Sequence, residues 1–184
     1  MKTGFDFLRT IISDINISEK EVEFGLKLPF LFRKFAESFD LGENALRIDK
    51  FLDEDNDFGQ LGVVFFELKS EKIFLNDFLN VEQIFVQWRN SKEDVEWAEK
   101  KLIRIGYLGQ AGFGGLYIGC DENKNSDEVW LYNADSAVKF KKVAVDIFEF
   151  IKKLRFTKDF SDFEDSYDYL FKNWGEDFWR IREK

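Results

Sequence analysis

Three short apolar runs, separated by turn-forming residues, constrain this chain more than any other feature. The runs are Leu102–Tyr107, Gly115–Cys120 and Glu128–Tyr132. In the first two, apolar side chains recur at every second position, which is the period of a strand with one buried face. The glycines of residues 109–115 and the polar residues of Asp121–Asp127 are typical of tight chain reversals. This part of the chain therefore predicts a three-stranded antiparallel meander at the centre of an α+β domain.

The glycine-rich sequence GQAGFGG, residues 109–115, could serve as a phosphate-binding loop or as a structural turn. A phosphate-binding loop needs a helix N-terminus directly after its glycines, so that backbone amides point at the anion. Here Gly114 and Gly115 lead into an expected strand, and no lysine follows them. We therefore interpret this loop as a structural turn.

The acidic sequence LDEDNDFG, residues 52–59, resembles the start of a calcium-binding loop, because Asp53, Asp55 and Asp57 occupy alternate positions. Such a loop needs glycine at its sixth position and a bidentate acid at its twelfth. Those positions hold Phe58 and Val64. We therefore interpret the acidic segment as the solvated tip of a hairpin.

Composition argues against several classes of function. The 184-residue chain is long enough for one sizeable core and contains no linker, so we expect a single domain over residues 1–184. Its 36 acidic and 27 basic residues give a net charge of −9, which disfavours nucleic-acid binding. Histidine is absent, so histidine-activated nucleophiles and histidine metal sites are excluded. We expect no enzyme activity and no cofactor, although composition alone leaves a glycosidase-like carboxylate pair open.

The expected location is the cytoplasm. No apolar run approaches the ~20 residues that a membrane span requires, and the N-terminus has no signal-peptide pattern. The single cysteine, Cys120, cannot form an internal disulfide and suits a reducing compartment. We interpret it as a small buried apolar residue at the end of a strand. Nothing in the sequence indicates the oligomeric state.

Apolar residues recur at helical spacing in several further segments. We expect helices over residues 5–15, 19–24, 29–42, 76–89 and 140–154. A capping box of Ser18 and Glu21 would open the second helix, and Pro29 and Gly42 would bound the third. A strand, the acidic turn and a second strand would fill residues 46–69. The expected fold is a mainly antiparallel central sheet of about five or six strands with helices packed against it.

Residues 155–184 form an acidic, aromatic extension that we expect to be helical. Between Asp159 and Tyr169 it has five acidic residues, four aromatic residues and no basic residue. The helical spacing of its apolar residues favours a last helix packed on the core. Aromatic side chains beside carboxylates also suit a surface that binds a basic protein, so both interpretations stay open.

Four segments, in their order along the chain, resemble the SUKH superfamily. They are Gly25–Pro29 with the helix and Gly42–Asn44 after it, Leu102–Gly106, Gly114–Gly119 paired with Val129–Tyr132, and Val143–Leu154. The resemblance covers about residues 18–154 and leaves the acidic extension outside. Members of this superfamily include fungal cell-wall-assembly regulators and bacterial immunity proteins that neutralise polymorphic toxins.

The resemblance implies a non-enzymatic binding protein whose partner is another protein. One expected function is that of an immunity protein which binds and neutralises a toxin domain, such as a basic nuclease. The alternative is a cytoplasmic scaffold or regulatory module. Carboxylates that steer a basic partner and aromatic residues that anchor it would come from the acidic turn and the extension. The candidate partner-binding residues are Asp53, Asp55, Asp57, Asp162, Glu164, Asp165, Tyr167 and Trp174.

Overall fold

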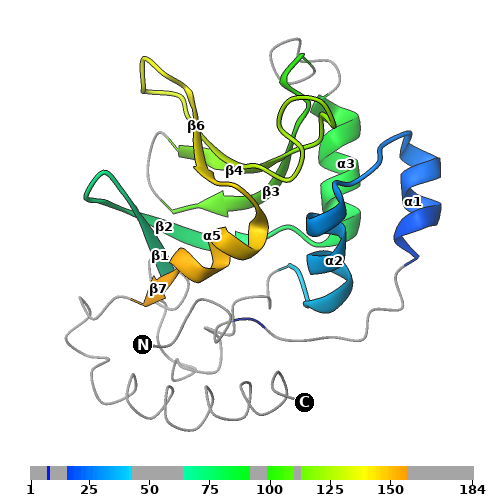
Figure 1. The fold of residues 1–184 in the computed structure, drawn as a ribbon, viewed down its shortest axis with the longest axis horizontal. Helices are drawn as coiled ribbons and strands as arrows, with labels where there is room; N and C mark the ends of the chain where they lie inside the picture. The colour runs from blue at the N-terminus through cyan, green and yellow to red at the C-terminus, as the bar shows by residue number, and fades with distance from the viewer. Residues whose placement is uncertain (1–7, 9–15, 43–63, 92–98, 110–112, 157–184) are drawn as a thin grey trace, which may run out of the picture.

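The computed structural model describes residues 8, 16–42, 64–91, 99–109 and 113–156. These residues form an antiparallel sheet with strand order β6-β5-β4-β3-β2-β1-β7 (Figure 1). The strands are β1 (Val64–Leu68), β2 (Glu71–Phe78), β3 (Leu102–Leu108), β4 (Phe113–Gly119), β5 (Val129–Asn133), β6 (Phe140–Ala144) and β7 (Arg155–Phe156). The expected α+β fold with a mainly antiparallel sheet is confirmed. The described sheet has seven strands, because β7 adds a two-residue edge.

Four helices of the described part share one hydrophobic core with the sheet. They are α1 (Ile17–Phe24), α2 (Phe30–Ser38), α3 (Val81–Ser91) and α5 (Ile147–Lys153). Phe35 of α2 is fully buried and lies at the centre of an aromatic cluster. Its ring centroid is 5.0 Å from Phe39, 5.9 Å from Phe78 and 6.0 Å from Phe148. None of the described helices is long and apolar enough to cross a membrane.

The central meander is confirmed, because β3, β4 and β5 are neighbours in the sheet and pair antiparallel. Ile103, Ile118 and Val129 pair across the three strands and lie in the core. The expected alternation fails at one position. A bulge between Arg104 and Gly106 inserts an extra residue into β3, so Tyr107 is 36% exposed instead of sharing the buried face.

The helix expected over residues 76–89 starts later than the spacing indicated. Strand β2 occupies residues 71–78 and pairs with β1 through a two-residue turn. Both turn residues, Lys69 and Ser70, have positive φ, 51° and 69°, which matches the twist of tight hairpins. Helix α3 then begins at Val81. The side chains of Asn80 and Gln83 accept hydrogen bonds from each other's backbone N–H, at 2.8 and 2.9 Å.

The helix expected over residues 140–154 is a strand followed by a shorter helix. Residues 140–144 form β6 at the edge of the sheet, and α5 begins at Ile147. The Asp146 carboxylate caps α5 by accepting a hydrogen bond from the Glu149 backbone N–H at 2.8 Å. The Nζ of Lys153 donates to the Val143 carbonyl of β6 at 2.6 Å, which ties α5 to the sheet edge.

Two helix boundaries near the N-terminus also differ from expectation. Helix α1 is capped by Asn16, whose side chain accepts from the Glu19 N–H at 3.3 Å, and the expected cap, Ser18, lies within the helix. Helix α2 ends at Ser38, with Phe39 as its C-cap, and so stops before Gly42. The helix expected over 5–15 lies outside the described residues apart from Leu8, as do residues 43–63 and the extension beyond Phe156.

Candidate functional site

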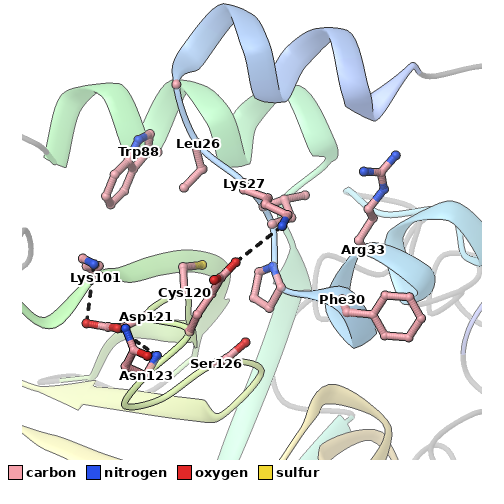
Figure 2. A pocket seen from close by; sticks show the side chains of 14 residues that line it. Leu26, Lys27, Phe30, Arg33, Trp88, Lys101, Cys120, Asp121, Asn123 and Ser126 are labelled. Atoms are coloured by element: carbon pink, nitrogen blue, oxygen red, sulfur yellow. Dashed lines mark hydrogen bonds and ion pairs between the residues drawn. The ribbon is translucent and has the colours of Figure 1, made fainter.

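A cavity of about 600 Å³ lies between the α1–α2 connection and the β4–β5 turn (Figure 2). We call it the groove. Residues 25–30 and Arg33 form one wall, and residues 120–123 and Ser126 form the other. Trp88 of α3 and Lys101, which precedes β3, complete the lining.

The first wall is held in place by the end of α1. Gly25 adopts φ +60°, which lets the helix end in a left-handed turn. The Gly25 N–H donates a hydrogen bond to the Val22 carbonyl at 3.4 Å, and the Leu26 N–H donates to the Glu21 carbonyl at 3.1 Å. The Glu21 carboxylate then accepts from the Leu28 N–H at 2.9 Å and from the Arg33 guanidinium at 2.9 Å. The extended connection is therefore fixed by hydrogen bonds at both ends.

The second wall is a turn stabilised by its own side chains. The Asp121 carboxylate accepts from the Asn123 N–H at 3.1 Å, and Asn125 Oδ1 accepts from the Asp121 N–H at 2.9 Å. Asn125 also donates to the Lys100 carbonyl at 2.8 Å. The hydrogen bond from Asn123, together with the charge of Lys101, lowers the pKa of Asp121. This carboxylate is therefore a structural anion that organises the turn.

Asp127 joins the two walls. Its carboxylate accepts a hydrogen bond from the Phe32 N–H at the start of α2, at 2.9 Å. Helix α2 needs this bond because Pro29, its N-cap, makes no side-chain capping bond. Burial raises the pKa of Asp127, against the lowering effect of the Phe32 and Leu31 N–H groups.

Two ion pairs border the groove, and one of them is exposed. Lys27 and Glu122 approach each other across it at 3.4 Å, with side chains 78% and 76% exposed. Lys101 and Asp121 form a second pair at 3.5 Å (Figure 2), in which the Asp121 side chain is only 9% exposed. An exposed pair such as Lys27–Glu122 contributes only about 0–1 kcal/mol. A ligand can therefore displace the Lys27–Glu122 pair at little cost.

Apolar side chains lie below the rim of the groove. Leu26 and Leu28 are buried, and Trp88 and Cys120 pack against the core. Burial raises the pKa of the Cys120 thiol well above its usual value, with the nearby charge of Asp127 as a second cause, so this thiol is a poor nucleophile. At the outer edge Phe30 is 68% exposed. An apolar floor with polar groups around it suits the binding of a ligand or a short protein segment.

The partner-binding residues expected from the sequence are not among those that form the groove. All eight of them, Asp53, Asp55, Asp57, Asp162, Glu164, Asp165, Tyr167 and Trp174, lie outside the described residues. The sequence did mark one wall of the groove, through Gly25 and Pro29. It marked Asp121–Asp127 of the second wall only as a turn. It did not place that turn beside the first wall, because the two meet through contacts distant in the chain, such as Asp127 with Phe32.

Comparison with known proteins finds no protein family that matches this chain and no matching curated protein.

Proposed function

We propose that this chain is a non-enzymatic immunity protein, which acts in the cytoplasm by binding and neutralising a toxin domain. The observation that carries the proposal is the position of the segments that resemble the SUKH superfamily. Gly25–Pro29, from the first segment, forms one wall of the groove. The β4–β5 pair, from the third, leads directly into the turn that forms the other wall. Segments about 95 residues apart in sequence thus converge on one site.

The surface chemistry of the groove supports a protein as the ligand. Phe30 offers an exposed aromatic ring at the rim, and the Lys27–Glu122 pair is exposed enough to exchange partners. Buried aromatic anchors contribute most of the binding energy in typical interfaces, whereas rim charges mainly set the association rate. A segment of the toxin that covers Phe30 would gain this anchor.

The net charge supports a basic toxin. With a net charge of −9, the chain attracts cationic proteins over distances of about one Debye length, ~10 Å at 0.1 M salt. Nucleases are basic because they hold phosphates. The acidic turn and the extension, which contain the eight candidate residues, would add to this attraction.

Co-expression tests the proposal. The product of each neighbouring open reading frame is expressed with and without this chain, and survival of the cells is measured. We expect this chain to rescue growth from one toxic product and to co-purify with it. Phe30→Ala should weaken rescue, while Val138→Ala, which removes an apolar side chain of similar exposure from the β5–β6 turn, should not.

Two results would contradict the proposal. One is the absence of rescue from every neighbouring product. The other is co-purification with several unrelated proteins and no effect on toxicity, which would favour the scaffold or regulatory module.

A further inference from the structure

A row of aromatic and cationic side chains crosses the sheet on the face opposite the core. Backbone pairing places Arg104 opposite Tyr117, Tyr117 opposite Trp130, and Trp130 opposite Lys142. Directly paired residues lie on the same face of a sheet. The adjacent positions Ile103, Ile118 and Val129 are in the core, so this set, which we call the Arg104 row, lies on the other face.

The side chain of Arg104 is held in a fixed orientation. Its Nε and Nη2 both donate to the Tyr117 hydroxyl, at 3.0 and 2.8 Å. Its Cζ lies 5.3 Å from the ring centroid of Tyr107 and 5.4 Å from that of Tyr117. Guanidinium–aromatic contacts of this kind are attractive. The planar head group is therefore positioned before any ligand arrives.

No carboxylate among the described residues forms an ion pair with Arg104. Arg33 is different, because Glu21 and Glu37 each lie 2.9 Å from its guanidinium. Asp77 is opposite Tyr107 and so shares the face of Arg104. No ion pair joins the Asp77 carboxylate to the Arg104 guanidinium. Burial raises the pKa of Tyr117, so its hydroxyl is a neutral partner. Partial burial of a cation without a neighbouring anion costs free energy, because the charge loses solvation. An anion bound to Arg104 would offset this desolvation cost.

Two glycines of the GQAGFGG sequence make room for this arrangement. A Cβ on Gly115 would lie 3.0 Å from Arg104 Nε and 2.9 Å from the Gly106 carbonyl oxygen. A Cβ on Gly114 would lie 2.6 Å from the ring of Tyr132. A side chain on Gly115 would displace Arg104, and one on Gly114 would displace Tyr132, which lies outside the row, so glycine is needed at both positions for close approach.

We infer that Arg104 is the docking point for a carboxylate, the side chain of an Asp or Glu on the protein partner. This inference rests on the proposed function only in naming the toxin domain as that partner. Guanidinium and carboxylate match as planar, forked groups, and Tyr, Trp and Arg are the residues most enriched in the energetic centres of interfaces. Lys142, at the far end of the row, is paired with Glu128 at 2.8 Å, so Arg104 is the cation of the row that has no carboxylate partner among the described residues.

A titration of the whole protein tests the site without the toxin. Sodium acetate is added at constant ionic strength, with sodium chloride as the reference, and the arginine Nε–Hε signals are followed by NMR. We expect a saturable shift of the Arg104 signal and none of the Arg89 signal. Arg89 is the matched control because its Cζ lies 5.4 Å from a Phe24 ring centroid on α1. Inorganic phosphate forms a separate arm. A shift with phosphate and none with acetate would overturn the assignment to a carboxylate, and so would the absence of any shift.

Binding to the toxin domain that the rescue experiment identifies gives the second test. Arg104→Gln should weaken affinity by about tenfold or more, whereas Arg89→Gln, with the same change of charge, should weaken it less than about twofold. Arg104→Lys keeps the positive charge but loses the two-pronged guanidinium, and it should give an intermediate loss of affinity. Thermal melting of each variant checks that it is folded. Equal affinity of wild type and Arg104→Gln would overturn the inference. If no toxin is found, the proposed function fails, but the acetate titration still decides the role of Arg104.

Discussion

The carboxylate of Asp127 caps α2 by accepting a hydrogen bond from the Phe32 backbone N–H, although the two residues are 95 positions apart. Proline at the N-cap leaves this helix without a local side-chain cap. The β4–β5 turn supplies the missing acceptor and a negative charge at the positive end of the helix dipole. The same bond fixes the distance between the two walls of the groove.

Loss of this cap should destabilise the protein. We expect Asp127→Ala to lower the free energy of unfolding by about 1 kcal/mol, as measured for other N-caps. Asp135→Ala removes an exposed carboxylate from the β5–β6 turn and should change it by less than about 0.5 kcal/mol. Urea denaturation measures both. Equal effects of the two substitutions would show that the Asp127 cap contributes nothing.

The pH dependence of stability should reveal the burial of Asp127. Its pKa is raised in the folded state above the ordinary value of 3.8, with burial as the main cause. Folding therefore favours the protonated carboxyl group, which adds to the free energy of unfolding at low pH. This stabilisation is fully present below pH 3.8 and is lost as the pH rises through the pKa of the folded state. Relative to Asp127→Asn, which does not titrate, the wild type should lose stability between acidic and neutral pH. Urea denaturation between acidic and neutral pH measures the free energy of unfolding of both proteins. A wild type that gains stability relative to Asp127→Asn as the pH rises would contradict this prediction.

Glu21 should matter more for stability than its neighbour on the same helix. Its carboxylate accepts from the Leu28 N–H and from Arg33 and is 12% exposed, whereas Glu23 is 59% exposed and pairs with Lys20. We expect Glu21→Ala to cost about 1–3 kcal/mol, because it leaves the Leu28 N–H without its acceptor. Glu23→Ala should cost less than about 0.5 kcal/mol. Thermal unfolding of the two variants should separate them clearly, and similar melting temperatures would argue against this role of Glu21.

Phenylalanine truncations should follow burial. Phe35→Ala should cost about 3–5 kcal/mol, because the ring is fully buried among other aromatic rings. Phe148 is only partly buried, so Phe148→Ala should cost less. Phe30→Ala should barely change stability, since that ring is exposed. Chemical denaturation gives the order, and a silent Phe35→Ala would contradict the described core.

The acidic extension should speed association with a basic toxin. Reversal of Asp162, Glu164 and Asp165 to Lys should lower the association rate, and the wild-type rate should fall as salt rises. Reversal of three exposed acids in the described part, Glu67, Glu71 and Glu99, changes net charge equally and should have a smaller effect. Stopped-flow or surface-binding kinetics provide the measurement. Unchanged rates in both tests would leave these acids with a role in solubility alone.

The sequence was informative where local pattern and turn chemistry agreed. The meander could be predicted because apolar alternation in β3 and β4 is bounded by glycines and by short polar residues. Helix α3 could be recognised from its spacing, but its start could not. The hairpin before it turns at Lys69 and Ser70, which carry none of the usual Asn-Gly or Asp-Gly signal, so the pattern alone predicts helix over the end of β2.

A bulge explains the other large error. Between β5 and β6 the register shifts at Val129, so that both Val143 and Ala144 face the core. Two adjacent buried residues followed by Ile147 reproduce helical spacing, so the pattern of a strand and a helix resembles that of one helix. The second wall of the groove and the Arg104 row depend on pairing between strands, which periodicity within a segment does not report.

The cap from Asp127 also sets an order of events during synthesis. At about 5–20 residues per second, some 5–20 s separate the emergence of Phe32 from that of Asp127, 95 residues later. During this interval α2 has no N-terminal acceptor, and its apolar residues Phe32, Phe35 and Ala36 lack the strands β3 to β5. The apolar face of α2 therefore stays without its packing partners in the sheet until the β4–β5 turn has emerged.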